Sequence, residues 1–291
     1  MAGLMGSPLF WAFTAIYLSV VLYLGYLGYK RTKASEDFML AGRKIHPWVI
    51  GISYGATFIS TSAIVGFGGT AAVYGTGLIW LAFLNIAVGV LLAFIVFGKP
   101  TRALGQKLRA ATFPDLLGKR FGSPFMQYST AALILTVMPL YAAAVMIGGS
   151  RFMEAALAID YSVALTVFAI FTSAYVIFGG LKAVMYTDAM QGLIMILGMA
   201  TLMLLTFSML GGPTQALSDL TALPSQMPAE MLEGMVSRGF TGWTSMPEVG
   251  SEFWLVLITT IIMGVGLGVL AQPQLVVRFM TADDNKALNR A

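Results

Sequence analysis

Residues 51–77, GISYGATFISTSAIVGFGGTAAVYGTG, decide the fold of this chain. The stretch is long enough to cross a bilayer and contains no charged residue. Seven glycines and a run of Ser and Thr interrupt it, and a glycine costs about 1 kcal/mol relative to alanine inside a helix. A helix broken in mid-membrane frees carbonyl and hydroxyl groups to bind an ion or a small solute. The stretch therefore predicts a transport site rather than a plain lipid anchor.

The rest of the chain has the composition of a polytopic membrane protein. Apolar residues make up 58% of it and charged residues 10%, with a mean hydropathy of +0.82. Soluble domains carry about 25% charged residues. The apolar runs predict an all-α integral membrane protein with about seven transmembrane helices. The predicted spans are residues 9–29, 48–73, 77–98, 125–149, 160–179, 188–210 and 252–277.

Basic residues mark one side of the membrane. Fifteen of the seventeen Lys and Arg residues follow the first, third, fifth and seventh spans. The positive-inside rule then predicts a multi-pass plasma-membrane protein with its N-terminus outside and its C-terminus in the cytoplasm. The net charge of +4 is a topology signal, and we expect no nucleic-acid partner because the basic residues are divided among several loops.

The chemistry of an enzyme is not visible in the sequence. There is no Cys and a single His, His46, so neither a thiolate cluster nor a zinc site is expected. The spans contain no paired carboxylates and no nucleophile–base pair, which disfavours a membrane enzyme. We predict a protein without a cofactor, whose partners are the lipid bilayer, an ion and a small-molecule solute.

Two connecting segments predict short helices. In residues 99–124, Thr112 can cap a helix whose first turn holds Pro114 and Asp115, and this helix is expected to lie on the inner membrane surface. The segment 211–251 is acidic and contains Pro at four positions, so it predicts short helices on the outer side.

A weak internal symmetry links two of the spans. Gly66-Phe-Gly68-Gly69 interrupts the second span, and Gly264-Val-Gly266-Leu-Gly268 interrupts the seventh. The two spans cross the membrane in opposite directions and lie five spans apart, which favours a five-helix unit repeated in inverted orientation. The alternative is that both are glycine-rich spans that only pack closely against other helices.

Five segments, in order along the chain, resemble motifs of the sodium/solute symporter family. That family includes proline, pantothenate, monocarboxylate, sialic acid and sugar carriers. The resembling segments are Asp37-Phe-Met-Leu-Ala-Gly-Arg43, Ala56-Thr-Phe-Ile59-Ser60, Thr112-Phe-Pro-Asp-Leu-Leu-Gly-Lys-Arg-Phe-Gly122, Gly179-Gly-Leu-Lys-Ala-Val-Met-Tyr-Thr-Asp188-Ala-Met-Gln191 and Gln272-Pro-Gln-Leu-Val-Val-Arg278-Phe-Met-Thr-Ala282.

The resemblance implies the five-plus-five inverted-repeat (LeuT-type) fold preceded by one extra helix. Residues 1–291 would then form a single transmembrane domain: the extra helix, a first repeat at about 48–210, and the first helix of the second repeat at about 252–277. Core helices seven to ten are absent in that count. We therefore expect an incomplete, N-terminal part, with a complementing C-terminal half.

The resemblance also implies a sodium site at the break. The carbonyls of Ala56 and Ile59 would bind Na⁺ as the coupling ion, with the Ser60 hydroxyl next to them. The alternative is a kink that serves close packing. Ser62, Thr61, Gly66, Gly266 and Gly268 are the expected solute contacts, although Ser62 and Thr61 might equally bond to their own helix. Phe58 and Ala63 replace polar residues of sugar carriers, which argues against a sugar.

Three residues toward the cytoplasmic side complete the expected site. Asp188 is expected in the first turn of the sixth span, where a helix N-terminus favours an anion; the functional alternative is a stopping point for departing sodium. Gln191 is expected to hydrogen-bond across helices beside it. Arg278 is expected to anchor the seventh span at the inner surface.

These expectations favour sodium-coupled symport of a small organic solute by alternating access. An amino acid such as proline, or a carboxylate, fits better than a sugar. A membrane sensor input domain derived from a carrier is the alternative from another class. A channel is disfavoured because no ring of charge and no repeated carbonyl filter is visible.

Overall fold

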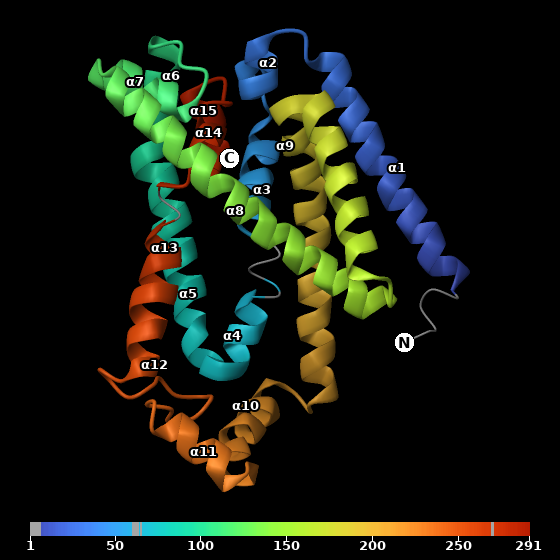
Figure 1. Cartoon of the computed structure of the whole chain (residues 1–291), viewed down its shortest axis with the longest axis vertical. Coiled ribbons are helices and arrows are strands. Elements are labelled where there is room, and N and C mark those ends of the chain that lie inside the picture. The colour runs from blue at the N-terminus through green and yellow to red at the C-terminus, as the bar shows by residue number, and fades with distance from the viewer. Residues whose placement is uncertain (1–6, 60–63, 65, 269–270) are drawn as a thin grey trace. The chain divides into compact units, whose positions relative to one another are not determined.

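A computed structural model describes residues 7–59, 64, 66–268 and 271–291 of the chain, and among them there is no β-strand (Figure 1). The expectation of an all-α protein is confirmed for these residues. The chain divides into two compact units. Unit 1 comprises Met1–Val65, Phe97–Leu193 and Pro273–Ala291, and unit 2 comprises Gly66–Val96 and Ile194–Gln272.

Unit 1 contains the N-terminal helix, the longest helices and the end of the chain. Its elements are α1 (Pro8–Arg31), α2 (Ser35–Leu40), η1 (Ala41–Arg43), α3 (Pro47–Phe58), α6 (Lys99–Lys107), α7 (Phe113–Phe121), α8 (Pro124–Leu157), the first part of α9 (Tyr161–Met209), α14 (Pro273–Phe279) and α15 (Asn285–Arg290).

Unit 2 contains the glycine-rich segments and the segment 211–251. Its elements are α4 (Phe67–Tyr74), η3 (Gly75–Leu78), α5 (Ile79–Leu84), η4 (Asn85–Val90), the remainder of α9, α10 (Pro213–Ala222), η6 (Leu223–Gln226), α11 (Ala229–Val236), α12 (Glu252–Leu255), η7 (Val256–Met263) and α13 (Gly264–Gly268). The helical turn η5 (Ala93–Gly98) leads from unit 2 into unit 1.

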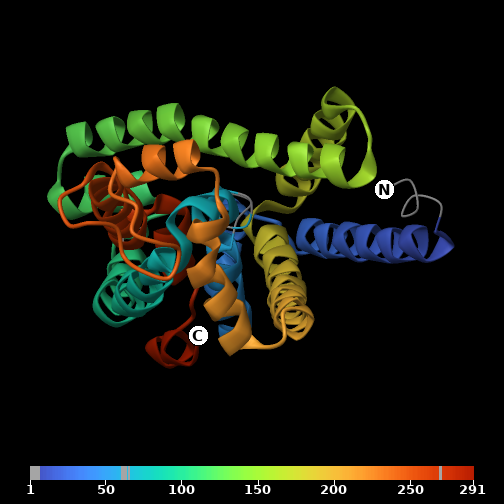
Figure 2. The ribbon, with the colours of Figure 1, turned by 90° about the horizontal axis from the view of Figure 1, so that it is seen from below.

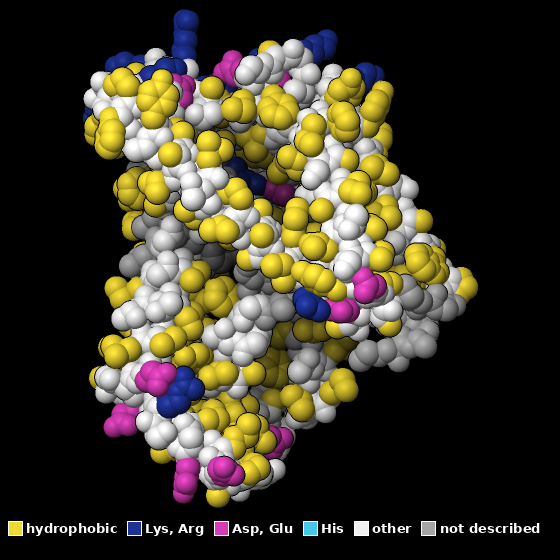
Figure 3. Space-filling model, in the orientation of Figure 1, with side chains coloured by type: hydrophobic (Ala, Val, Ile, Leu, Met, Phe, Trp, Pro, Cys, Tyr) yellow, Lys and Arg dark blue, Asp and Glu magenta, His cyan; other side chains and the backbone are white. Residues whose placement is uncertain are grey.

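Four helical runs among the described residues are long and apolar enough to cross a membrane. They are α1, the run from Phe67 to Lys107, α8 and α9. At most 22% of the most apolar window of each is buried within the chain. Figure 3 shows hydrophobic side chains over α1 and α8, with Lys and Arg gathered near α2, α6 and α7. Such apolar surface needs lipid or more protein to cover it. The expected number of seven spans remains a prediction.

The chain reverses direction inside α9. Gly180 is the residue inside α9 with a non-helical conformation, with a φ of 58°. The α9 ribbon turns back on itself in Figure 1. A Cβ atom at Gly180 would lie 2.9 Å from the carbonyl oxygen of Phe38, so both the backbone conformation and the space require glycine. The turn separates the residues predicted as the fifth span from those predicted as the sixth.

The predicted short helix after residue 112 is confirmed as α7. The Thr112 hydroxyl accepts a hydrogen bond of 3.2 Å from the Asp115 N–H, and Gly122 ends the helix with a φ of 60°. Gly118 packs against the side chain of Gln127, so α7 lies beside the first turns of α8 (Figures 1 and 2). Its position on a membrane surface remains a prediction.

The segment 211–251 folds onto the glycine-rich helices of unit 2. It contains the expected short helices α10, η6 and α11. Trp243 is buried with Phe240 and Phe253 in a cluster, and its indole N–H donates a 2.7 Å hydrogen bond to the Ala72 carbonyl. The Trp243 carbonyl accepts a 2.7 Å bond from the Thr76 N–H. This segment therefore covers the junction of α4 and η3.

Candidate ion and solute site

The first helix of the second predicted span ends before the glycines that were expected to interrupt the span. Pro47 begins α3 at a position that suits proline, and the helix ends at Phe58. Ile59 leaves the helical conformation with a ψ of 72°, and its N–H closes the last turn on the Gly55 carbonyl at 3.1 Å. The next α-helix, α4, begins at Phe67. The end of α3 agrees with the break that the resemblance implied at Ala56–Ser60. The interruption expected at Gly66–Gly69 is corrected, because Gly68 and Gly69 lie inside α4.

The expected sodium ligands lie at this helix end. A helix leaves its last carbonyls without helical partners, which brings the carbonyls of Ala56 and Ile59 into consideration as ion ligands. Ala56 itself is buried, and a Cβ atom at Gly192 of α9 would lie only 2.7 Å from its methyl group. The Ala56 methyl group therefore packs against Gly192 at the contact between α3 and α9. Ser60, Thr61 and Ser62 lie outside the described residues.

A polar cluster lies one turn before the break. Arg278 of α14 places its Nη2 2.5 Å from Oδ2 of Asp188 on α9, with 4% and 18% of the two side chains exposed. Arg278 Nε also donates to the Ser53 hydroxyl at 3.0 Å, and that hydroxyl donates to Asp188 Oδ2 at 3.3 Å. The Thr57 hydroxyl donates to the Ser53 carbonyl at 2.8 Å and reaches Asp188 Oδ2 at 3.4 Å. We call Ser53, Thr57, Asp188 and Arg278 the Asp188 cluster.

The Asp188 cluster joins three segments that are far apart in sequence. Ser53 and Thr57 lie on one face of α3 at a spacing of four residues, Asp188 comes from α9, and Arg278 comes from α14. The interruption expected at Gly264–Gly268 is corrected, because these residues form α13. One carboxylate and two hydroxyls are oxygen ligands of the kind that a hard cation prefers. The Arg278 guanidinium is paired with the Asp188 carboxylate in this structure. A cation that binds Asp188 would therefore have to displace Arg278.

Two sequence-based expectations are corrected here. Asp188 does not lie in the first turn of a helix, because the helix resumes directly after Gly180 and Asp188 is eight residues further on. A guanidinium rather than a helix N-terminus stabilises its charge. Arg278 is not a surface anchor, because it is buried and donates to Asp188, Ser53 and the Gln274 carbonyl.

Gln191 hydrogen-bonds across helices, as expected. Its Nε2 donates to the hydroxyl of Tyr17 at 2.8 Å, which links α9 to α1. Gln191 therefore lies about one turn from Asp188 along α9, but it hydrogen-bonds to Tyr17 of α1, whereas Asp188 pairs with Arg278 of α14.

The expected solute glycines differ in their surroundings. No described atom lies within 4 Å of the position of a Cβ at Gly66 or Gly268. Gly266 is instead buried, and a Cβ there would lie 3.4 Å from Leu84 and 3.7 Å from the Asn85 nitrogen. Gly266 thus lets α13 approach the helix that contains α5 and η4. A role of these three glycines in solute binding remains a prediction.

Sequence reasoning missed Ser53, Thr57 and Arg102. The two hydroxyls had a signal in their four-residue spacing on an apolar helix. Arg102 had no such signal, because it belongs to a basic stretch that is typical of a solvated loop. In the structure it is only 8% exposed. The described residues contain no group of three or more His, Asp or Glu side chains that could hold a metal ion.

Comparison with known proteins identifies the family. The model of the Sodium:solute symporter family matches residues 38–291, which is most of the chain. The chain belongs to the sodium:solute symporter family. It is therefore related to transporters rather than enzymes, and the family together with the apolar helices indicates a multi-pass plasma-membrane protein.

Relatives within the family include carriers of two different solutes. The chain is 30% identical over 279 residues to a sodium/pantothenate symporter of Haemophilus influenzae, covering 94% of this chain and 54% of that protein. It is 28% identical over 279 residues to an osmoregulated proline transporter of Bacillus subtilis, covering 95% and 52%. The chain thus spans about half the length of the curated relatives it matches.

A solved structure shows the same fold. The chain superimposes with a TM-score of 0.75 on a Na⁺-coupled sialic acid symporter determined in a substrate-bound, outward-open state. The alignment covers 96% of this chain and 56% of that one, at 20% sequence identity. The likeness supports the LeuT-type helical fold and leaves the solute open.

Proposed function

We propose that this symporter-family chain takes part in sodium-coupled symport of a small organic solute by alternating access. The observation that carries the proposal is the Asp188 cluster beside the end of α3. There α3 ends, and the hydroxyls of Ser53 and Thr57 lie within 3.4 Å of the Asp188 carboxylate oxygen Oδ2. Family membership supports Na⁺ as the coupling ion rather than a bound cofactor.

The proposed sodium path leads from the helix break to Asp188. The carbonyls of Ala56 and Ile59 and the Ser60 hydroxyl would bind the ion at the break. Asp188 would receive it next, with Ser53 and Thr57 supplying further oxygens. Sodium and the Arg278 guanidinium are both cations, so they compete for the same carboxylate. Arrival of the ion would release Arg278 and loosen α14 from α9, which couples ion movement to a change in helix contacts.

The proposed solute is an amino acid such as proline, or a carboxylate. Its support is the specificity of the relatives, which include proline and pantothenate carriers. Ser62, Thr61, Gly66, Gly266 and Gly268 are the proposed contacts. Small residues would leave room for such a solute, and hydroxyls would satisfy its polar atoms.

The proposed architecture is one five-helix repeat plus the first helix of a second, with the N-terminus outside. The relatives are about twice as long as the matched region, so we propose that transport also needs a segment equivalent to their remaining part. Co-expression of this chain with such a segment should give uptake that neither piece gives alone. Sodium-driven uptake by the 291-residue chain alone in liposomes would contradict this part of the proposal.

The coupling role of the Asp188 cluster is tested by sodium activation of uptake in the active assembly. Thr57→Val removes one oxygen from the cluster and should raise the sodium concentration needed for half-maximal uptake. Thr201→Val is the matched control, because the Thr201 hydroxyl only bonds back to the Leu197 carbonyl of its own helix. Equal sodium activation in both variants would remove the Asp188 cluster from the ion path.

A further inference from the structure

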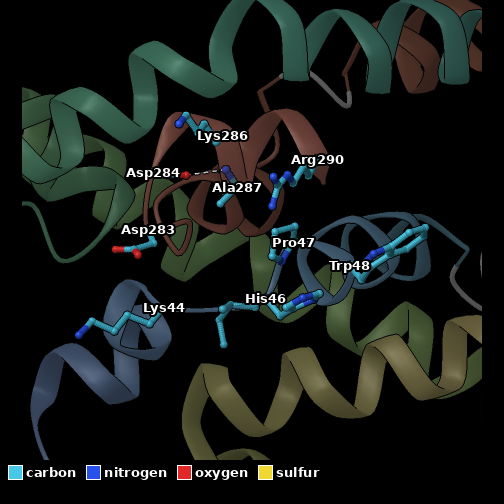
Figure 4. A pocket seen from close by; sticks show the side chains of 10 residues that line it. Lys44, His46, Pro47, Trp48, Asp283, Asp284, Lys286, Ala287 and Arg290 are labelled. Carbon is cyan, nitrogen blue, oxygen red and sulfur yellow. Dashed lines mark hydrogen bonds between the residues drawn. The ribbon is translucent and has the colours of Figure 1, made fainter.

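A cleft separate from the Asp188 cluster lies in unit 1, between the segment leading into α3 and the turn and helix α15. Its volume is about 430 Å³. Lys44, His46 and Trp48 line it from one side, and Lys286 and Arg290 line it from α15 (Figure 4). The cleft therefore combines cationic and aromatic side chains from two segments more than two hundred residues apart in sequence.

Buried contacts hold the α15 side of the cleft in place. Arg102 of α6 donates from Nη1 to the Asp283 carbonyl and from Nε to the Asn285 side-chain oxygen, both at 2.9 Å. Leu288 of α15 is 3% exposed. The Ile45 N–H donates to the Thr281 carbonyl at 3.4 Å, which ties the two sides together. The cleft is thus formed by the fold before any ligand arrives.

The charges in the cleft leave an excess of cations. Lys44, Lys286 and Arg290 form no ion pair with any carboxylate in the part of the chain that the structure describes. Asp283 and Asp284 also line the cleft. Asp284, however, uses Oδ1 to accept a 2.6 Å hydrogen bond from the Ala287 N–H at the start of α15. The lining therefore contains three cationic side chains and two carboxylates, one of which accepts a hydrogen bond from the helix backbone.

The position of the cleft indicates its ligand. Trp48 is 71% exposed in the first turn of α3, where an apolar helix begins, and tryptophan is typical of the membrane–water interface. Basic pockets at the cytoplasmic ends of transmembrane helices attract anionic lipid headgroups. We propose that this cleft binds the phosphate headgroup of an anionic phospholipid from the inner leaflet. This binding does not depend on transport.

The test is lipid binding to the purified 291-residue chain in detergent, followed by native mass spectrometry. Phosphatidylglycerol, phosphatidylcholine and inorganic phosphate are titrated separately. We expect phosphatidylglycerol to bind more tightly than phosphatidylcholine. Each cation near a membrane surface contributes roughly fivefold in affinity, so Lys286→Gln with Arg290→Gln should weaken phosphatidylglycerol binding by about 25-fold.

Two further variants separate the cleft from general electrostatics and from misfolding. Lys107→Gln removes an exposed charge at the end of α6, outside the cleft, and should leave the affinity unchanged. Ala287→Trp fills the cleft without changing its charge and should weaken binding, with an unchanged circular dichroism spectrum. An equal loss in Lys107→Gln, no preference for phosphatidylglycerol, or tight binding of inorganic phosphate without lipid binding would each overturn the proposal.

Discussion

Arg278 and Asp188 form a buried ion pair although they are 90 residues apart in sequence, and Ser53 hydrogen-bonds to both. Removal of one partner of a buried pair leaves the other charge without compensation. We expect Arg278→Leu to lower the free energy of unfolding by about 3–5 kcal/mol, measured by chemical unfolding in detergent. The double variant Arg278→Leu with Asp188→Leu should recover most of that loss. Simple additivity of the two single changes would show that the pair contributes no coupling energy.

The turn at Gly180 predicts the effect of an alanine at this position, and Gly198 of the same helix provides the matched control. Gly180→Ala should lower the free energy of unfolding by more than about 1 kcal/mol, because alanine disfavours the positive φ and its Cβ would crowd Phe38. Gly198→Ala in the same element adds a Cβ into open space and should raise stability by up to about 1 kcal/mol. Thermal melts of the two variants should therefore shift in opposite directions.

Much of the backbone was predictable because its signals are local. Thr112, Pro114 and Asp115 indicated the start and cap of α7. These effects act within one or two helical turns. Helix ends of this kind can therefore be predicted without knowing which helices pack beside them. The glycines at 68 and 69 did not mark the end of α3, because they lie inside α4.

The Asp188 cluster was only partly predictable because it depends on packing. Asp188 was singled out, but its partner was assigned to the membrane surface, since an Arg after an apolar span is usually a topology signal. Only the approach of α14 to α9 and α3 buries Arg278. Arg102 was missed for the same reason, because two of its partners, Asp283 and Asn285, lie about 180 residues further along the chain.

The orientation of the chain can be tested by single-cysteine labelling, because the native sequence contains no Cys. Cys at Ser225 should react with an impermeant thiol reagent from outside intact cells. Cys at Ser35 or Lys107 should react only after permeabilisation; all three positions are exposed, so access depends on the membrane alone. Outside labelling at Lys107 would reverse the predicted topology.

Acid should weaken the start of α2, where the Asp37 carboxylate accepts hydrogen bonds from the Lys33 and Ala34 N–H groups. The Lys33 N–H lowers the pKa of Asp37, slight desolvation opposes this, and the Ala34 N–H and the Lys182 ammonium lower it further. A lowered folded-state pKa means that the stabilisation is complete above the ordinary value of 3.8 and is lost as the pH falls through the folded value. The melting temperature of Asp37→Asn should therefore approach that of the native chain below pH 3.8. A constant difference from pH 7 to pH 3 would contradict this.

The contact between Ala56 and Gly192 restricts how these two positions can diverge among related sequences. One methyl group fills the space between α3 and α9, and a second would overlap it at 2.7 Å. An ancestral change from glycine to alanine at 192 would therefore require a compensating glycine at 56, so we expect the two positions to co-vary. The same shared volume implies that a larger residue at 56 alters the helix contact as well as the proposed sodium site beside it.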